Sequence, residues 1–531
     1  MDDEIIKEMQ NAFKADKSFV LVGGAGSGKT HSLKELVNQI YSNQACAKVA
    51  CITYTDVAAE EIKKRCLNTE RTNVLQVSTI HSFLWQNIKN FQPGLKRVLI
   101  DLLINGCIRK DDNIELDELT HLLKDKDVDY KNYRKISDGV ISHDDLLKIF
   151  AEMLKSYPLL SRIFADRYDY ILVDEYQDTS PVVINAFIEL IKKKYKTKFG
   201  FFGDTMQAIY SNGIGDLNEY IADGTLEKIE KQDNYRCSRA AIELCNKIRN
   251  DGLIQCAAHL DDNGHVDNKT GRAIFVYSNS GLDDFRKTDV YNEIFETKSP
   301  DKEMYLTNRL VAQNAKFWEL LAAYTSRETY GQSGKERLIG TNKDKLAAHL
   351  SHMAKLVYLY NHRVFDEFIQ AVSIKVERHS DKRKLKGKME TFLEKNMSVE
   401  NAINSMNELG LLHVSDEVQE FPILYNKVKN IAFSEALALY EYENKHTPFS
   451  TQHGVKGDEF NNVLVVLDNG QWNIYDFNEL FSDNPPANVL KLFYVCISRT
   501  ANNVAVFMKE PPESIINKAK QWFGNDNVIS V

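Results

Sequence analysis

The run SFVLV at residues 18–22, followed by GGAGSGKT at residues 23–30, decides the fold of this chain. The second stretch has the spacing G-x-x-x-x-G-K-[ST], which is typical of a phosphate-binding loop between a buried strand and a helix. Glycines let backbone N–H groups turn toward an anion, and the following helix points its positive dipole end at the same place. We expect Lys29 to reach the β- and γ-phosphates of a nucleotide, and the Thr30 hydroxyl to bind Mg²⁺. The loop backbone would complete this ATP site at Gly24, Ala25, Gly26, Ser27 and Gly28.

Composition sets broad limits on the class of protein. The 531 residues are enough for three or four domains, and 43% hydrophobic with 27% charged residues is ordinary for a globular protein with a sizeable core. A net charge of −8 argues against an overall nucleic-acid coat but allows a local basic groove. We see no membrane-spanning run, no basic n-region of a signal peptide, and eight cysteines without a C-x-x-C pattern. We therefore expect a cytoplasmic protein with reduced thiols and no zinc or iron–sulfur site.

An acidic pair follows the apolar run YILV at residues 170–173. This places Asp174 and Glu175 at the carboxyl end of a buried strand, where open parallel sheets bind their ligands. One carboxylate there can bind Mg²⁺, and its neighbour can act as a general base toward water. Together with the phosphate loop, the pair predicts a nucleotide-hydrolysing site.

Three more side chains suit phosphoryl-transfer chemistry. Gln207 follows another predicted strand at residues 199–202 and can sense a γ-phosphate or position water. Arg236, in the segment Asn-Tyr-Arg, and Arg499, on a predicted helix, carry permanent charges that suit a phosphate in the transition state. Gln10 can bond both edges of adenine, although a plain surface glutamine is an equal alternative.

Other predicted strand ends suit nucleic-acid contact. Tyr54 ends the apolar run at residues 48–55 and can stack on a base, or simply pack on the edge of the sheet. Thr79 and His81 end the next short strand and suit contact with a phosphate backbone. Each of these signals is weak alone, so they count only in combination with the phosphate loop.

Two long segments read as helical insertions. Residues 85–167 and 331–446 have helical patterning without further glycine-rich loops, and apolar strands at 273–277 and 303–307 indicate a second α/β domain. A basic cluster at residues 378–388 either binds nucleic-acid phosphates or forms a solvated helix face.

The ordered set of segments resembles a known family. GAGSGKT, TYTDVAAEEIKKR, STIHSF, VDEYQDTS, GDTMQAIY, NYR, the stretch STQHGVKGDEF and YVCISRT are similar, in this order, to the motifs of superfamily 1 helicases of the UvrD/Rep/PcrA type. The resemblance implies an α/β protein with two RecA-like P-loop domains, each a parallel sheet with an inserted mainly helical subdomain. The implied boundaries are 1–84 with 168–230, 85–167, 231–330 with 447–531, and 331–446.

The same resemblance assigns roles to single residues. Gln10 would read adenine, Tyr235 would stack on it, and Glu459 would touch the ribose. Asp174 would bind the metal, Glu175 would be the base, and the γ-phosphate would be sensed by Gln207 and, from the second domain, by Arg236 and Arg499. The implied DNA track consists of Thr53, Tyr54, Thr79, His81, Tyr210, Thr451 and His453.

Two departures from the family pattern concern the DNA track. Ser211-Asn212-Gly213 stands where many relatives have a stacking tryptophan, and Asp56-Val57 replaces the usual Asn-Lys.

The first interpretation is an ATP-dependent translocase on single-stranded or tailed duplex DNA, a 3′–5′ helicase. The alternative is a DNA-activated ATPase switch that regulates a partner nuclease without processive unwinding. A small-molecule phosphotransferase fits worst, because it leaves the second domain unexplained.

The compact build is also similar to the helicase-like partners of OLD-type nucleases in Gabija anti-phage systems. This similarity rests on size and on the segment LTNRLVAQNAKF at residues 306–317. It implies a partner nuclease and a defence role, and it accords with the absence of a recognisable nuclease motif in this chain.

Overall fold

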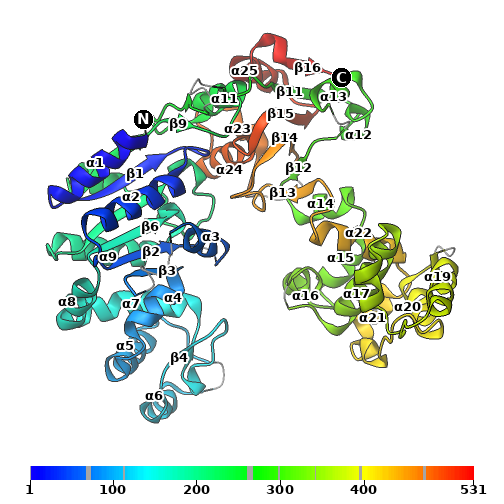
Figure 1. The fold of residues 1–531 in the computed structure, drawn as a ribbon, viewed down its shortest axis with the longest axis horizontal. Helices are drawn as coiled ribbons and strands as arrows, with labels where there is room; N and C mark the ends of the chain where they lie inside the picture. Colours follow the sequence, from blue (N-terminus) through cyan, green and yellow to red (C-terminus); the bar gives the residue numbers. More distant parts are fainter. Residues whose placement is uncertain are drawn as a thin grey trace. The chain divides into compact units, whose positions relative to one another are not determined.

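The structure is a computed structural model that describes residues 2–54, 56–66, 73–111, 114–259, 267–296, 299–340, 342–393, 397–469 and 474–531. Thr55, at the end of the predicted strand segment 48–55, lies outside the described residues. The chain forms two compact units (Figure 1). Unit 1 comprises Met1–Ala273 with Pro485–Asn503, and unit 2 comprises Ile274–Asn484 with Val504–Val531.

Unit 1 is built on a six-stranded sheet with the order β3-β2-β6-β7-β1-β8. The five recorded pairings in this sheet are all parallel. Its strands are β1 (Ser18–Gly23), β2 (Val49–Thr53), β3 (Leu75–Thr79), β6 (Tyr170–Asp174), β7 (Lys198–Gly203) and β8 (Leu226–Lys231). The short apolar runs of the sequence become strands because both faces of the sheet are covered by other elements.

Strand β1 shows how the two faces are filled. Phe19 and Leu21 join a core cluster with α1 (Asp2–Lys14), α2 (Lys29–Asn43) and α3 (Asp56–Cys66). Val20 and Val22 point to the other face and join a cluster with α9 (Pro181–Lys192) and the inserted helices. With apolar side chains buried on both faces, β1 is held rigidly, and the loop that follows it starts from a fixed position.

The remaining elements of unit 1 extend this core. The inserted part contains α4 (Ile80–Ile88), α5 (Gln92–Ile104), α6 (Leu116–Asp125), α7 (His143–Ser156), α8 (Pro158–Arg167) and the small sheet of β4 (Asp129–Tyr130) with β5 (Val140–Ile141). The other elements are α10 (Asn218–Ala222), β9 (Asp233–Asn234), α11 (Arg239–Ile248), β10 (Cys256–Ala257) and α24 (Ala487–Ile497). Unit 1 therefore includes a helix from near the end of the chain.

Unit 2 contains a second six-stranded sheet with the order β13-β12-β14-β15-β11-β16. Its strands are β11 (Ala273–Ser278), β12 (Lys302–Tyr305), β13 (Phe449–Thr451), β14 (Phe460–Leu467), β15 (Thr500–Lys509) and β16 (Val528–Ser530). The pairings β11–β16, β12–β13 and β12–β14 are parallel. When the strands of each sheet are numbered along the chain, both sheets have the order 3-2-4-5-1-6. The predicted α/β class with two parallel-sheet cores is confirmed.

The helices of unit 2 fall into two groups. Between β12 and β13 lie α14 (Asn308–Asn314), α15 (Trp318–Thr325), α16 (Gly334–Leu338), α17 (Lys345–Asn361), α18 (Phe365–Ala371), α19 (His379–Leu393), α20 (Val399–Glu408), α21 (Pro422–Val428) and α22 (Phe433–Glu443). Beside the sheet lie α12 (Leu282–Phe285), α13 (Asp289–Ile294), α23 (Phe477–Leu480) and α25 (Glu513–Phe523). Within the described ranges, no helix has the length and apolar character needed to cross a membrane.

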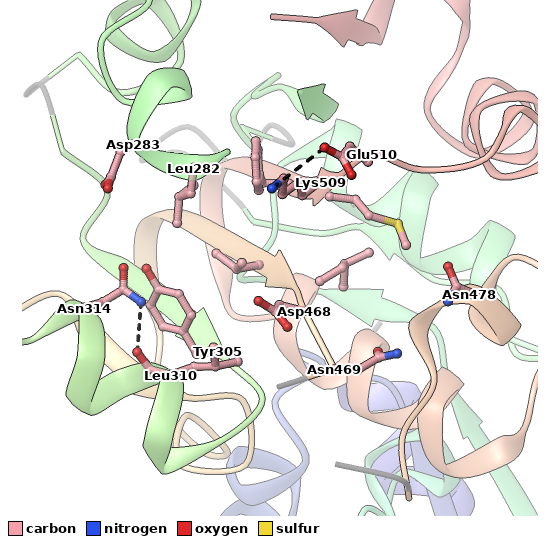
Figure 2. A pocket seen from close by; sticks show the side chains of 14 residues that line it. Leu282, Asp283, Tyr305, Leu310, Asn314, Asp468, Asn469, Asn478, Lys509 and Glu510 are labelled. Carbon is pink, nitrogen blue, oxygen red and sulfur yellow. Dashed lines mark hydrogen bonds and ion pairs between the residues drawn. The ribbon is translucent and has the colours of Figure 1, made fainter. Parts of the chain in front are cut away.

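A cavity of about 570 Å³ lies at the carboxyl ends of β12, β14 and β15 in unit 2 (Figure 2). Its polar lining includes Asp283, Asp468, Lys509 and Glu510, of which the last two form an ion pair of 3.8 Å. Among the described residues that line it, none is a predicted site residue. The predicted phosphate loop and acidic pair lie in unit 1, at the carboxyl ends of β1 and β6.

Candidate active site

The phosphate loop joins β1 directly to α2. Gly26 and Gly28 have φ values of 74° and 76°, in the left-handed region that glycine adopts without strain. The Lys29 side chain is buried, and its Nζ donates hydrogen bonds to the carbonyl oxygens of Gly23 and Gly24 at 3.0 and 3.1 Å. The loop thus curls around its own lysine, and the contact of Lys29 with nucleotide phosphates stays a prediction from the sequence spacing.

The two predicted metal ligands lie next to each other. The Thr30 hydroxyl donates to Asp174 Oδ2 at 3.2 Å, although 144 positions separate these residues in the sequence. Burial and the charge of Glu175 raise the pKa of Asp174 to about 7, while Lys29 opposes the shift. The Asp174 carboxylate is buried with too little positive charge around it, and the Thr30 hydroxyl lies beside it. These two oxygen ligands form a donor set that fits Mg²⁺. The residues present therefore fit the implied cation.

Glu175 occupies an unusual backbone conformation directly after β6. Its φ is 51°, which is uncommon for a residue with a side chain and is often found at functional sites. The Gln177 side-chain amide donates to Glu175 Oε2 and accepts a hydrogen bond from the Asp204 backbone N–H at 3.2 Å. A Cβ at Gly203 would lie 2.2 Å from Gln177 Oε1, so glycine is needed there. Gln177 orients the candidate base, a role that the sequence alone did not indicate.

Gln207 connects two other predicted groups. Its Nε2 donates to Asp204 Oδ2 at 3.0 Å, and its Oε1 accepts from Arg499 Nη2 at 3.2 Å. Arg499 is almost fully buried, and its Nε also donates to the Val495 carbonyl oxygen at 2.9 Å. Burial, and the charge of Arg236, lower the pKa of Arg499. The structure therefore brings the predicted glutamine and one predicted arginine into direct contact.

A buried network behind Gln207 was not predicted. Arg249 donates to Asp204 Oδ1 at 3.1 Å and to the Tyr494 hydroxyl oxygen at 2.7 Å, and it also pairs with Asp251. Although burial opposes it, the charges of Arg249 and Lys29 hold the pKa of Asp204 below its ordinary value. The Tyr494 hydroxyl in turn accepts from the backbone N–H of Ala25 at 3.0 Å. This network ties the phosphate loop to the segment that carries Gln207.

The Asn-Tyr-Arg segment packs directly on the phosphate loop. The Tyr235 backbone N–H donates to the Gly26 carbonyl oxygen at 2.9 Å, and a Cβ at Gly28 would lie 3.6 Å from the Tyr235 ring. A Cβ at Gly26 would lie 2.6 Å from the Cβ of Arg236. The resemblance gave Arg236 and Arg499 to a second domain, whereas both lie in unit 1 with the loop. Gln10 is half-buried on α1, which packs beside α2.

Two tyrosines predicted for the DNA track lie close together on unit 1. The rings of Tyr54 and Tyr210 are stacked with centroids 6.2 Å apart, and their side chains are 44% and 40% exposed. Burial raises the pKa of both phenols, and the carboxylate of Asp178 adds to the shift in each. An exposed aromatic pair suits base stacking, while the nearby negative charge disfavours a phosphate at this point.

The other strand-end residues lie on neighbouring strands. Thr53 and Thr79 are register partners at the ends of β2 and β3. Thr53 is only 2% exposed, so its hydroxyl lies below the surface, whereas Thr79 and His81 are half-buried at the start of α4. The His81 ring contacts the ring of His143, with centroids 4.7 Å apart, and His143 hydrogen-bonds to Tyr130. The inserted part therefore contributes to this surface, which the sequence did not show.

Three predicted residues belong to unit 2. Thr451 ends β13, and its hydroxyl oxygen accepts from the Gly454 backbone N–H at 3.0 Å. The His453 ring lies 3.0 Å from the Tyr475 hydroxyl through its Nε2, and burial lowers the pKa of His453. Glu459 precedes β14. These three residues therefore belong to unit 2, whereas the phosphate loop belongs to unit 1.

Comparison with known proteins shows which families this chain is similar to. A family model described as an AAA domain matches residues 7–213, which contain the phosphate loop, Asp174 and Gln207. Gabija protein GajB of Bacillus cereus (strain HuB5-5) is 24% identical over 98% of this chain and 97% of GajB. ATP-dependent DNA helicase Rep of Buchnera aphidicola subsp. Schizaphis graminum (strain Sg) is 27% identical over 47% of this chain and 44% of Rep. A probable DNA helicase II homolog of Rickettsia felis is 24% identical over 44% of this chain and 42% of the homolog.

This chain is similar to GajB along almost its whole length, and to UvrD/Rep-type DNA helicases over a little less than half of it. The matches to Rep and to the DNA helicase II homolog span less than half of those proteins, whereas the match to GajB is nearly complete on both sides. Because the match covers 98% of this chain, the similarity to GajB includes the helical insertion of unit 2.

Proposed function

We propose that this protein is an ATP hydrolase that is activated by DNA and translocates along single strands, as a 3′–5′ helicase. The observation that carries the proposal is the contact of Thr30 with Asp174 beside the Lys29 loop. The Thr30–Asp174 pair, the loop around Lys29 and the carboxylate of Glu175 follow strands β1 and β6 at one edge of the sheet, which supports a nucleotide site there. The names of the similar proteins, DNA helicases and GajB, support DNA as the partner.

In this proposal each residue has a definite task. Bound ATP with Mg²⁺ supplies the phosphoryl group to be transferred and the positive charge that shields it. Lys29 and the loop N–H groups hold the phosphates, and Thr30 and Asp174 hold the cation. Glu175, oriented by Gln177, accepts a proton from the attacking water.

The second half of the site would sense the γ-phosphate. Arg499 already contacts Gln207, and Gln207 contacts Asp204, so these three groups respond together to a change at the site. A guanidinium in a water-poor environment stabilises charge that develops during phosphoryl transfer more strongly than one in bulk water. Because Tyr210 follows Gln207 by three residues, the same segment leads to the candidate DNA track.

A second candidate function is a DNA-activated ATPase switch that regulates a partner nuclease of the OLD type in anti-phage defence. Burial raises the pKa of Tyr54, and the carboxylates of Asp178 and Asp144 add to the shift, so negative charge lies near the aromatic pair. Together with Asn212 in place of a stacking tryptophan, this favours weak gripping of DNA over processive unwinding. The near-complete similarity to GajB supports the defence role.

The test is steady-state ATP hydrolysis with and without single-stranded DNA, with Lys29→Ala as the inactive control. We expect DNA to stimulate ATP hydrolysis by the wild type and expect Lys29→Ala to abolish this stimulation. A rate that DNA does not change would contradict both functions for the chain alone. Displacement of one strand from duplexes with 3′ or 5′ tails then separates them, because the helicase unwinds 3′-tailed duplexes and the switch hydrolyses ATP without unwinding.

A further inference from the structure

Unit 2 holds a cavity of about 600 Å³ beside the edge strand β13, lined also by residues of α17 and α22. Its lining includes four lysines and two carboxylates, so its net charge is +2. The lysines are Lys302, Lys343, Lys355 and Lys445, and the carboxylates are Glu443 and Asp458. A hollowed surface with an excess of positive charge attracts anions.

The charges of this cavity are unevenly compensated. Lys343 donates to Glu443 at 2.7 Å and to the Ser351 hydroxyl oxygen at 3.2 Å, so this pair is largely neutral. Burial lowers the pKa of Lys302, and the charge of Lys445 adds to the shift while Asp458 opposes it. Within the described part of the chain, neither Lys355 nor Lys445 forms an ion pair. These two lysines therefore supply the uncompensated charge.

Hydroxyl and backbone groups converge on the same cavity. Ser450 and Thr451 line it from β13, which among the strands of the described ranges pairs with β12 alone and forms the edge of the sheet. A Cβ at Gly454 would lie 2.8 Å from Thr451 Oγ1 and 3.2 Å from Ser450 Oγ, so only glycine lets the loop backbone approach both hydroxyls. Hydroxyl, N–H and ammonium groups together are the usual donors to phosphate oxygens.

Aromatic side chains complete the lining. Tyr440 and Tyr442 of α22 and Phe449 of β13 border the cavity, and all three are half-buried. Aromatic faces beside basic groups bind single strands without sequence preference, because every base has a face that stacks. The combination suits a strand with bases better than an isolated phosphate ion.

We propose that this lysine groove, made by Lys302, Lys343, Lys355, Lys445, Ser450 and Thr451, binds the phosphate backbone of a single DNA strand. It extends the predicted contact at Thr451 onto the helical insertion of unit 2. The inference deepens the proposed function, on which it rests, by assigning a strand-binding role to the insertion.

The test compares binding of a 20-nucleotide oligo(dT) to the full-length protein at several NaCl concentrations. Each phosphate contact that is lost lowers the slope of log K against log salt by about 0.7 for single strands. The double variant Lys355→Ala/Lys445→Ala is expected to lower this slope by about 1.4 and to weaken binding several-fold at 100 mM NaCl. The matched control is Lys287→Ala/Lys335→Ala in unit 2, whose two lysines are exposed and lie outside the groove lining, and it is expected to keep the wild-type slope.

The outcomes separate this inference from the proposed function. An unchanged slope in the groove variant, with ATP hydrolysis still stimulated by DNA, would overturn the groove alone. A lowered slope without any stimulation in the wild type would support the groove and overturn the motor function.

Inorganic phosphate provides the second probe. If millimolar phosphate raised the melting temperature of the wild type but not of the groove variant, and the DNA slope were unchanged, the cavity would be a free-phosphate site and the strand proposal would be wrong.

Discussion

The Tyr494 hydroxyl oxygen accepts a hydrogen bond from the Ala25 backbone N–H at 3.0 Å, although the two residues are 469 positions apart. The same hydroxyl donates to Asp204 Oδ2 at 3.1 Å, and Asp204 also accepts from Gln207. A single phenol thus connects the phosphate loop with the predicted γ-phosphate sensor. Since all of these groups are buried, a change in one of them is transmitted to the others without competition from water.

Tyr494→Phe tests this connection. The substitution keeps the ring but leaves the Ala25 N–H without its partner, which costs about 1–3 kcal/mol when the group stays buried. We expect a lower melting temperature and a reduced ATP turnover, because the loop and Gln207 are no longer held together. Tyr133→Phe is the matched control, since Tyr133 is 51% exposed on the insertion of unit 1. Turnover and melting temperature that match the wild type in Tyr494→Phe would contradict the proposed coupling.

Lys29→Ala should abolish hydrolysis. The change removes the buried ammonium that the loop surrounds, and the loss of one such charged group at a reacting phosphate costs on the order of 100-fold or more in turnover. Hydrolysis of ATP is measured alongside nucleotide binding. Lys34→Ala on the same helix α2 is the control, because Lys34 is partly exposed and pairs with its neighbour Glu35 at the surface. Equal losses in both variants would indicate damage to α2 instead of loss of the phosphate contact.

Glu175→Gln should separate binding from chemistry. Glutamine has the same size, and its side-chain oxygen can still accept the hydrogen bond from Gln177. It cannot accept a proton from water. We therefore expect ATP to bind with nearly unchanged affinity while turnover falls by about 100-fold or more. Single-turnover hydrolysis and nucleotide binding measure the two effects. If the variant hydrolysed ATP at the wild-type rate, Glu175 would not be the base.

The sequence was sufficient to predict which side chains come together when each of them follows a strand. It did not predict the contacts of side chains that depend on long-range packing. Asp174 comes directly after an apolar run, and Lys29 and Gln207 follow two other runs within a few residues, so the strand ends of a parallel sheet predict that the three lie at one edge. Arg249 and Tyr494 carry no such local signal, because their roles arise only when α11 and α24 pack behind Asp204. Gln177 and His143 likewise acquire meaning only from their spatial neighbours, Glu175 and His81.

Arg499→Ala should reduce turnover while leaving binding of single-stranded DNA intact. Arg499 is buried against Gln207 and Ser498, and the proposed role is stabilisation of charge during hydrolysis. We expect turnover to fall by about 100-fold, with oligo(dT) affinity unchanged within twofold. Arg499→Lys serves as the second variant, because it keeps the charge but not the paired donors, and it is expected to recover only part of the rate. Parallel loss of hydrolysis and of DNA binding in both variants would point to misfolding.

His81 should make unit 1 less stable in mild acid. Burial lowers the pKa of His81 to about 4, and the charge of His143 adds to the shift while Asp144 opposes it. In the unfolded chain the pKa returns to about 6.5, so between pH 6.5 and 4 the unfolded state binds a proton that the folded state does not. Stability therefore falls as the pH drops through this window, and His81 adds no further loss below it.

Melting temperatures at pH 7 and pH 5 measure this effect. His81→Asn removes the titrating group and should show a smaller loss between the two pH values than the wild type. His121→Asn on α6 is the control, because His121 is exposed and should leave the wild-type pH dependence unchanged. If His81→Asn lost as much stability as the wild type between pH 7 and pH 5, His81 would not be the group whose protonation destabilises this surface of unit 1.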